Sequence, residues 1–294
     1  MKRITLIINP ISGGKDKHGI LAAVCRHLDL SECRYEVLTT RKAGDATEWA
    51  RESQSDLVVA VGGDGTVSEV AKGLLGTEKA LGIIPCGSGD GLALHLGISR
   101  DPVRIARTLN EACITQMDAG LMDGRPFFCT AGVGLDAAVS LDFARSSKRG
   151  LNTYISTAWE DWKHREPDQY VIETDQGIWA GPALFVTAGN ANHWGNEARI
   201  APKASLRDGL LDITVVQPFS TWEIPELAAR LMTGKADTSR HVLTMRSSRV
   251  HIHRNHPGPA HADGDPFEAG TDIELNIQPG ALRVVVPPSR LEKI

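Results

Sequence analysis

The chain is poor in cysteine, and the cysteines that it has form no recognisable pattern. There are five among 294 residues, at irregular spacing and with no pair separated by two residues. A disulfide framework needs paired cysteines in a small secreted domain, and a zinc knuckle needs closely spaced pairs. The sequence therefore argues against both, and we expect reduced, mostly buried thiols in a cytoplasmic protein.

Long apolar runs and an excess of basic residues are also missing. No stretch approaches the roughly 20 apolar residues that span a bilayer, and the apolar run after the first residues is too short for a signal peptide. The formal net charge of −4 provides no broad positive field. We therefore expect neither a transmembrane segment nor a nucleic-acid partner.

What the chain does contain is a glycine-rich turn between an apolar run and an amphipathic segment. The run Leu57–Val61 favours a buried strand, and Gly62 and Gly63 follow it directly. Glycine lets the backbone turn tightly and approach a ligand with no side chain in the way. Apolar residues then recur at helical spacing up to Leu75. This stretch predicts strand, turn and helix.

The helix in this stretch is predicted to begin at Thr66. Thr66 and Glu69 have the T-x-x-E spacing of a capping box. The backbone N–H groups at such a helix start suit an anion such as phosphate. Asp64 lies in the loop, where a carboxylate is unfavourable beside phosphate unless a metal ion or a proton-carrying substrate meets it. An ordinary tight turn remains the alternative.

Similar turns recur through the first 118 residues. Strands are predicted at 4–8, 35–39, 57–61, 81–85 and 114–117, with helices at 20–30, 44–51, 66–75, 92–96 and 102–110. Alternating strands and helices favour a parallel sheet, which binds ligands at the carboxyl ends of its strands. The turns that begin at Asn9, Thr40, Gly62 and Cys86 would then share one edge. Ser12–Lys15 adds a weaker candidate phosphate loop without Walker spacing.

The pattern changes after Asp118. Strands without intervening helices are predicted at 127–133, 170–174, 178–187, 211–216, 248–253, 273–277 and 282–286, with a hairpin turn at 122–125 and helices at 151–164 and 224–232. Such a series favours an antiparallel β-sandwich. We therefore predict a parallel α/β domain over 1–118, with the tail 288–294 returning to it, and an antiparallel β-sandwich domain over 119–287.

Four segments resemble one family in the expected order. Residues 62–66 read GGDGT, 81–92 read LGIIPCGSGDGL, 200–212 read IAPKASLRDGLLD, and 261–266 read HADGDP. Together they resemble the diacylglycerol-kinase-type lipid kinases, which include sphingosine and ceramide kinases. The resemblance implies a Rossmann-like nucleotide domain joined to a β-sandwich, in agreement with the strand pattern.

The resemblance also implies roles for single residues. The positions that would contact ATP are Asn9, Thr40, Gly62, Gly63, Gly65, Thr66, Glu69 and Ser88. Asp265 matches the family's catalytic Glu, which takes the proton of the acceptor hydroxyl. Asp64 would orient a magnesium ion or the acceptor. Asp263 is the nearby substitute if the shorter Asp265 does not reach.

A magnesium site is implied near residue 208. The matching segment would hold the ion through the carboxylate of Asp208 and the backbone carbonyls of Ser205 and Leu210, since oxygen ligands suit magnesium. Arg207 departs from the acidic or polar residue that is common there in the family. The plain alternative is an Asp-Gly turn before a strand.

The resemblance predicts a lipid kinase that uses ATP and Mg²⁺. The acceptor would be diacylglycerol or a related lipid alcohol, met peripherally at a membrane surface. An NAD kinase carries a similar glycine loop and is one alternative. A silent nucleotide-binding regulator is another, because Asp90 replaces the family's Asn and Asp265 its Glu. The sequence does not select the lipid, and a monomer and a homodimer both remain open.

Overall fold

The structure is a computed structural model that describes residues 2–10, 17–29, 31, 33–145, 160, 166–195, 198–292 and 294. The predicted loop Ser12–Lys15 and, apart from residue 160, the predicted helix 151–164 lie outside the described residues. Contacts divide the chain into two compact units. Unit 1 is Met1–Asp118 with Pro279–Ile294, and unit 2 is Ala119–Gln278.

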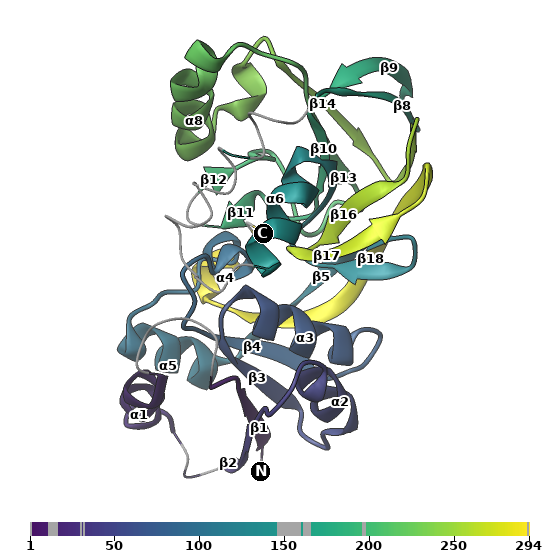
Figure 1. Ribbon diagram of the computed structural model, residues 1–294. Coiled ribbons are helices and arrows are strands. Elements are labelled where there is room, and N and C mark those ends of the chain that lie inside the picture. The colour runs from purple at the N-terminus through teal and green to yellow at the C-terminus, as the bar shows by residue number, and fades with distance from the viewer. Residues whose placement is uncertain are drawn as a thin grey trace. The chain divides into compact units, whose positions relative to one another are not determined.

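Unit 1 is built on a parallel sheet with the strand order β2-β1-β3-β4, and the end of β18 lies beside β4 (Figure 1). The strands are β1 (Lys2–Ile8), β2 (Cys33–Thr39), β3 (Leu57–Gly62), β4 (Ala80–Pro85), the first part of β5 (Cys113–Met122) and the last part of β18 (Asp272–Val286). The helices are α1 (Lys17–Cys25), α2 (Asp45–Glu52), α3 (Asp64–Leu74), α4 (Gly91–His95), α5 (Pro102–Glu111) and the short η3 (Pro288–Arg290). Helices α1 and α5 pack together, and so do α2 and α3. The predicted Rossmann-like architecture is confirmed.

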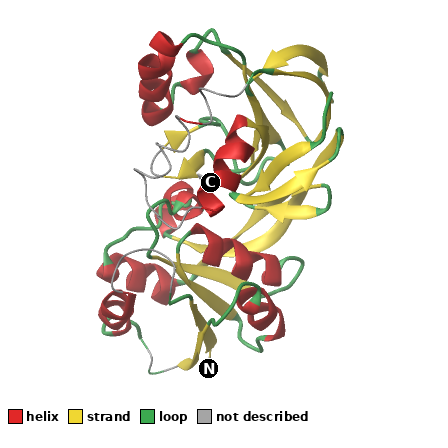
Figure 2. Cartoon of the chain, viewed as in Figure 1, coloured by secondary structure: helices red, strands yellow, loops and turns green. Residues whose placement is uncertain are grey.

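The strands of unit 1 end at the same level. The register pairs Ile8 with both Thr39 and Val61, and Gly62 with Pro85. Because the strands are parallel, the loops that follow β1, β2, β3 and β4 lie along one edge of the sheet (Figure 2). Strands β3 and β4 are buried along their whole length, as is usual for central parallel strands. The predicted convergence of the turns is therefore confirmed.

The predicted start of the third helix was wrong. Helix α3 begins at Asp64 rather than Thr66, and its N-cap is Gly63, which has no side chain to cap it. The carboxylate of Glu69 instead accepts a hydrogen bond from the backbone N–H of Gly44 at 3.2 Å. Glu69 therefore ties α3 to the start of α2 and does not complete a capping box.

Unit 2 is a β-sandwich. Its strands are the last part of β5, β6 (Arg125–Phe127), β7 (Thr130–Gly134), β8 (Asp168–Thr174), β9 (Gly177–Ala183), β10 (Phe185–Gly189), β11 (His193–Gly195), β12 (Ala198–Arg199), β13 (Leu211–Val216), β14 (Val242–Ser247), β15 (Arg249–Arg254), β16 (Gly258–Ala262), β17 (Asp265–Ala269) and the first part of β18. One sheet has the order β14-β13-β10-β7-β16-β17, and the other contains β18-β15-β8-β9. These neighbours pair antiparallel, and apolar side chains such as Val186 and Ile252 from the two sheets share one core.

Several predicted strands of unit 2 have different limits. The run 178–187 is divided at Leu184, because the chain leaves β9 in one sheet and enters β10 in the other. The run 127–133 is interrupted before Thr130, and 273–277 and 282–286 belong to the single long strand β18. Helix α6 (Leu135–Arg145) was not predicted, nor were β14, β16 and β17.

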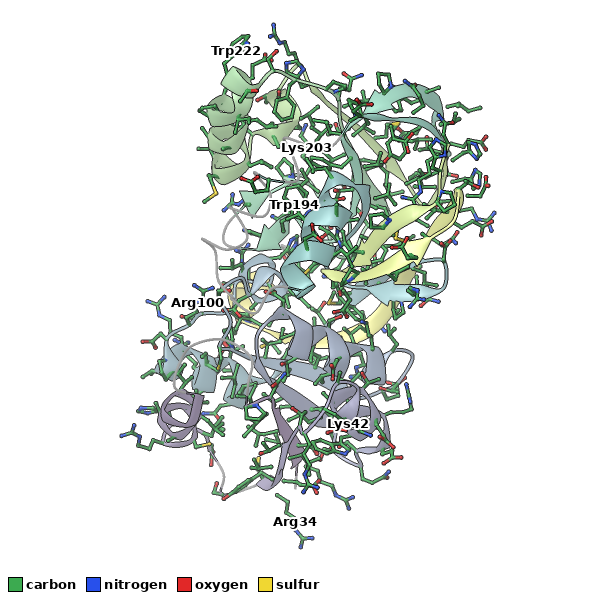
Figure 3. The ribbon with its side chains drawn as sticks, viewed as in Figure 1. Arg34, Lys42, Arg100, Trp194, Lys203 and Trp222 are labelled. Carbon is green, nitrogen blue, oxygen red and sulfur yellow. The ribbon has the colours of Figure 1, made fainter. Side chains whose placement is uncertain are left out.

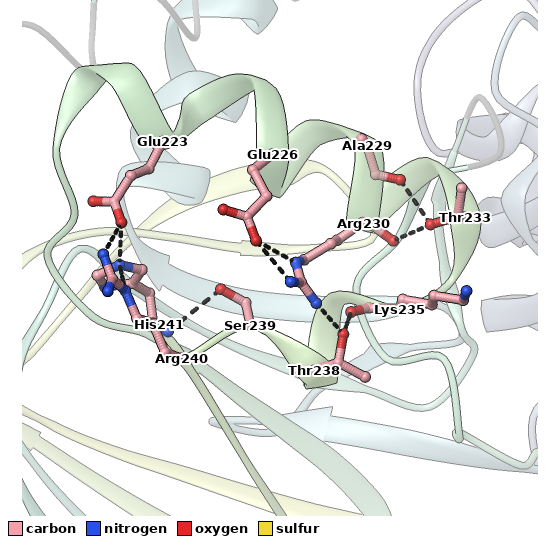
Figure 4. Close-up of polar contacts among 10 residues, drawn as sticks. All are labelled: Glu223, Glu226, Ala229, Arg230, Thr233, Lys235, Thr238, Ser239, Arg240 and His241. Carbon is pink, nitrogen blue, oxygen red and sulfur yellow. Dashed lines mark hydrogen bonds and ion pairs between the residues drawn. The ribbon is translucent and has the colours of Figure 1, made fainter.

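The second predicted helix of this unit is confirmed as α8 (Ile224–Thr233), which follows η1 (Thr221–Glu223) and precedes η2 (Ala236–Thr238). A capping box joins Ser220 and Glu223. Arg240 and His241 also bind the Glu223 carboxylate (Figure 4). The Ser220 N–H, His241 and Arg240 together lower the pKa of Glu223 to about 2. Among the described helices, none is long and apolar enough to cross a membrane.

Candidate active site

The first glycine turn joins β3 to α3. Gly62 ends the strand, and Gly63 has an extended backbone that leads directly into the helix. The N–H groups in the first turn of a helix have no partner within the helix and attract anions. Gly65 lies in this turn, is exposed, and has open space where a side chain would project. The side chain of Thr66 is buried at 2% exposure and faces away from solvent.

The second glycine turn packs against the first, backbone to backbone. The N–H of Cys86 donates to the carbonyl of Gly62 at 2.8 Å. A Cβ atom at Gly63 would lie 3.1 Å from the Cα of Gly87, and one at Gly87 would lie 2.7 Å from the Cα of Gly63. A Cβ atom at Gly87 would therefore clash, and one at Gly63 would force the Gly87 backbone to shift by a few tenths of an ångström. The glycines are therefore required by the contact between the turns themselves.

Asp64 ties the two turns together. Its Oδ2 accepts a hydrogen bond from the N–H of Asp90 at 2.8 Å, and its Oδ1 accepts one from the N–H of Gly91 at 2.6 Å. Gly91 is the first residue of α4, so the carboxylate also lies at the positive end of that helix. The geometry gives Asp64 a clear positioning function, which the sequence did not reveal.

The extra charge of Asp90 is compensated within the loop. Its side chain is 2% exposed, and Oδ2 accepts from Nε of Arg100 at 3.0 Å. Arg100 is labelled in Figure 3. The other oxygen accepts from the N–H of Gly87 at 2.9 Å. Arg100 also donates to the carbonyls of Ser88 and Gly89, each at 3.3 Å. No sequence motif identified Arg100, because it lies ten residues after Asp90 and reaches this loop only in the folded protein.

The other predicted nucleotide residues lie along the same edge of unit 1. The N–H of Asn9 donates to the carbonyl of Val61 at 3.3 Å, and the N–H of Thr40 donates to the carbonyl of Ile8 at 2.8 Å. Thr40 is buried, whereas Ser88 is exposed. The structure thus brings together the loops that carry Asn9, Thr40, Gly62 and Ser88. Glu69 belongs instead to the contact between α3 and α2.

The loop after Thr40 is held by Asp45. This buried side chain accepts hydrogen bonds from the backbone N–H groups of Arg41 at 2.8 Å and Lys42 at 3.0 Å. The Arg41 bond is the main cause that holds the pKa of Asp45 below its usual range. A carboxylate that binds two backbone donors fixes the turn. The Thr40 loop therefore has a defined shape at the edge of the sheet.

In unit 2, Asp265 is placed by a tight hairpin. Asp263 and Gly264 have φ values of 52° and 81° and connect β16 to β17, with Ala262 paired to Asp265. Positive φ at both central residues is typical of a type I′ turn, and Asp-Gly is a favoured pair for it. Asp265 is the first residue of β17 and is exposed.

Asp263 anchors this hairpin to another part of unit 2. Its carboxylate accepts hydrogen bonds from the backbone N–H groups of Phe128 at 2.9 Å, Cys129 at 2.7 Å and Thr130 at 3.3 Å. A carboxylate held by several backbone donors is stabilised as the anion and poorly placed to take up a proton. The geometry therefore favours Asp265 over Asp263 as the acceptor of a proton.

At the predicted magnesium site the positive charge is provided by a side chain of the protein, Arg246. The Asp208 carboxylate forms an ion pair with Arg246, and its Oδ1 accepts from the N–H of Leu210 at 3.1 Å. Arg246 also lies 3.3 Å from Asp212. Burial raises the pKa of Asp212 to about 6 although Arg246 opposes this shift.

A magnesium ion at this place would have to displace the guanidinium group from Asp208. Magnesium demands a regular set of oxygen ligands. Among Ser205, Asp208 and Leu210 only Asp208 has a carboxylate, and that carboxylate already forms an ion pair with Arg246. Among the described residues, no group of three or more His, Cys, Asp or Glu side chains is arranged to hold a metal ion. In this arrangement the residues do not fit the ion, and Arg246 is the feature that the sequence interpretation missed.

Comparisons with known proteins cover both units. The model of the diacylglycerol kinase catalytic domain matches residues 3–122, and that of the YegS C-terminal NAD kinase beta sandwich-like domain matches residues 129–286. A diacylglycerol kinase of Bacillus subtilis strain 168 is 29% identical over 273 residues, which cover 90% of each protein.

Solved structures show the same fold. That of a diacylglycerol kinase from Bacillus anthracis strain Sterne has a TM-score of 0.74 at 21% identity and covers 98% of both chains. An NAD kinase from Archaeoglobus fulgidus in complex with ATP has a TM-score of 0.56 at 12% identity, over 99% of this chain and 96% of that one. With both of its units matched, the chain belongs to the family of ATP-dependent lipid kinases that join a diacylglycerol kinase catalytic domain to a YegS-type C-terminal domain.

Proposed function

We propose that the protein transfers the γ-phosphate of ATP to the hydroxyl of a lipid, with diacylglycerol as the leading acceptor and phosphatidic acid as its product. The single observation that carries this proposal is the backbone contact between Gly63 and Gly87. It leaves the start of α3 lined by main chain, which suits the phosphates of a nucleotide. The Bacillus subtilis relative named a diacylglycerol kinase supports the acceptor.

The phosphates of ATP are proposed to bind along the carboxyl edge of the unit 1 sheet. The exposed Gly65 leaves the helix start accessible, and Asn9, Thr40 and Ser88 lie on the neighbouring loops. Asp64 is proposed to act by holding the second turn against the first. Magnesium is proposed as the ion that accompanies ATP, since it neutralises phosphate charge in phosphoryl transfer.

Asp265 is proposed as the general base. Its carboxylate would take the proton of the acceptor hydroxyl as the hydroxyl oxygen forms a bond to the γ-phosphorus. The bond between that phosphorus and the oxygen bridging to the β-phosphate breaks, and ADP leaves. The exposed position of Asp265 at the start of β17 supports this role, because a carboxylate on the protein surface is accessible to an acceptor.

The acceptor is proposed to be met at a membrane surface by a cytoplasmic, peripherally bound protein. The acyl chains of a diacylglycerol hold it in the bilayer, so its hydroxyl is presented at the boundary with water. A homodimer is compatible with this proposal but is not required by it.

The test is phosphate transfer from labelled ATP with magnesium. The acceptors are detergent-dispersed diacylglycerol, monoacylglycerol, sphingosine, ceramide and phosphatidylglycerol, with NAD in a parallel reaction. Label on diacylglycerol supports the proposal, and label on another lipid alone replaces the acceptor. Label on NAD would instead indicate an NAD kinase activity, which is the activity named for the structural neighbour from Archaeoglobus fulgidus. ATP binding without any labelled product would favour a nucleotide-binding regulator.

A further inference from the structure

A buried pair of ionisable side chains lies behind the hairpin that carries Asp265. His261 on β16 is 3% exposed, and Asp136 on α6 is 4% exposed. Nε2 of the histidine lies 3.2 Å from Oδ2 of the aspartate. No motif predicted this pair, because Asp136 belongs to a helix that the sequence pattern did not reveal and the two residues are 125 positions apart.

The other ring nitrogen of His261 faces the hairpin. The backbone N–H of Gly264 donates to Nδ1 at 3.3 Å. A nitrogen that accepts a hydrogen bond carries no proton, so the proton of the neutral ring lies on Nε2 and is donated to Asp136. Gly264 directly precedes Asp265 in the chain. The ring therefore connects a buried carboxylate to the turn that aims Asp265.

A second donor binds the same oxygen of Asp136. Its Oδ2 also accepts from the hydroxyl of Thr187 at 2.6 Å, and that threonine is fully buried on β10. The other oxygen, Oδ1, is buried and has no hydrogen-bond partner among the described residues. A buried carboxylate that is only partly satisfied is costly to the fold. Such a group is retained most readily where it orients something else.

The sheet leaves space for this pair. A Cβ atom at Gly132 on β7 would lie 2.2 Å from Oδ2 of Asp136 and 3.0 Å from Nε2 of His261. Any other residue at this position would push the carboxylate and the ring apart. Gly132 thus belongs to the same arrangement as the pair.

We propose that His261 is a positioning residue for Asp265, an inference that rests on the proposed role of Asp265 as general base. Asp136 and Thr187 orient the ring, and the ring holds the N–H of Gly264. Asp263 anchors the same turn from its other side. Together these contacts fix the direction in which the Asp265 carboxylate leaves the hairpin.

Two substitutions separate the two bonds of the ring. In His261→Asn, the amide oxygen replaces Nδ1 as acceptor for Gly264 but the donor to Asp136 is lost. In His261→Gln, the amide reaches toward Asp136 but leaves Gly264 without its acceptor. Because small misplacement of a reacting group is expensive, we expect His261→Gln to lower kcat about 10- to 100-fold and His261→Asn to lower it by about threefold at most.

The KM for ATP should stay within about twofold of wild type in both variants, because the nucleotide loops are unchanged. The matched control is His253→Gln, which alters an exposed histidine that pairs with Asp272 at 2.9 Å. This control should leave kcat unchanged. Thr187→Val is the milder second variant, in case the His261 variants do not fold, and should lower kcat without raising the KM for ATP.

Two measurements test the geometry without any activity. Nitrogen NMR of the histidine ring should show the proton on Nε2 and none on Nδ1. Hydrogen exchange of the Gly264 amide should be faster in His261→Gln than in wild type and in His261→Asn. A proton on Nδ1, or exchange at Gly264 that is the same in all three proteins, would overturn the inference.

The kinetic outcomes also separate the inference from the proposed function. Equal losses of kcat in His261→Asn and His261→Gln, or none in either, would overturn the positioning role. Full activity in Asp265→Asn would instead overturn the proposed role of Asp265 as general base, and the kinetic part of the inference would fall with it. The NMR and exchange results would then still report whether the ring holds the hairpin.

Discussion

The glycine-rich loops of unit 1 and the hairpin of unit 2 are held in place in different ways. The loops depend on backbone, and their central contact joins two glycines, Gly63 and Gly87. The hairpin depends on side chains that reach distant partners, since Asp263 binds the N–H of Cys129 from 134 positions away. A backbone site is damaged by adding atoms, whereas a side-chain site is damaged by removing donors or acceptors.

The difference explains why the contact between the glycine loops could be anticipated from the sequence, whereas the partners that hold the hairpin could not. Loops that touch through their backbones need glycines at the points of contact, and closely spaced glycines are visible as a sequence motif. A hairpin held by distant partners shows only its own Asp-Gly pair in the sequence.

The strongest test of the hairpin is Asp265→Asn. Loss of a general base should lower kcat about 10²- to 10⁴-fold, because proton removal from the acceptor is no longer assisted. Asp265→Glu should restore much of this loss, since the family's acid is then present. Steady-state kinetics with the accepted lipid measures both. Glu268→Gln, on the exposed face of the same strand, should leave kcat unchanged.

The strongest side-chain test of the nucleotide loops is Asp64→Ala. This variant removes the acceptor for the N–H groups of Asp90 and Gly91, and bonds to a charged group contribute about 1.5–3 kcal/mol. We expect the KM for ATP to rise about tenfold or more. Asp56→Ala, an exposed change just before β3, should have no such effect. Unchanged ATP affinity in Asp64→Ala would contradict its positioning role.

Arg100 and Asp90 provide a smaller test that two substitutions sharpen. Arg100→Ala removes the guanidinium that pairs with the buried Asp90 carboxylate, and we expect ATP affinity to fall by about twofold to fivefold for a half-exposed pair. Asp90→Asn, which restores the family's residue, should be nearly neutral and should rescue Arg100→Ala. A double-mutant cycle on the dissociation constant of ATP measures this coupling. Additive losses would mean that the pair does not support the loop.

Arg246→Ala tests whether the Arg246 guanidinium excludes a metal ion from Asp208 and Asp212 in unit 2. Without the guanidinium, Asp208 and Asp212 repel each other, and we expect the melting temperature to fall by about 2–4 °C. Magnesium should then restore part of this loss in the variant and leave wild type unchanged. Arg249→Ala, an exposed arginine nearby in sequence, is the control. Equal stabilisation of wild type by magnesium would show that Arg246 does not exclude the ion.

Glu223 should give the smallest effect, and one that depends on pH. Its pKa is about 2 in the folded protein against an ordinary value of 4.5. Because the folded pKa is the lower one, the stabilisation is complete above pH 4.5 and is lost as the pH falls toward 2. The difference in melting temperature between wild type and Glu223→Gln should shrink over that window. A difference that grows on acidification would contradict the contacts at η1.

The local parts of the fold followed from the sequence, and the non-local parts did not. Strand β13 and helix α8 were recognised because their periodicity is regular within one element. The break at Leu184 was missed, since β9 and β10 form one continuous apolar run and only sheet pairing separates them. Helix α6 was missed as well, although it carries the buried Asp136.

The candidate site shows the same limit. The glycines of the turns and Asp265 could be named from their motifs. The roles of Asp64, Arg100 and Arg246 could not, because each depends on partners that folding brings to it. Even the start of α3 depended on context, since Glu69 binds Gly44 of a neighbouring loop instead of its own helix end.

The most direct measurement is the titration of ATP into wild type, Gly63→Ala and Asp265→Asn by calorimetry. Gly63→Ala places a methyl group 3.1 Å from the Cα of Gly87, which presses the two turns apart, and should weaken ATP binding. Asp265→Asn should bind ATP as wild type does, although it no longer transfers phosphate. ATP binding that is unchanged in Gly63→Ala, or that is weakened in Asp265→Asn, would contradict the claim that the loops depend on backbone contact and the hairpin on side chains.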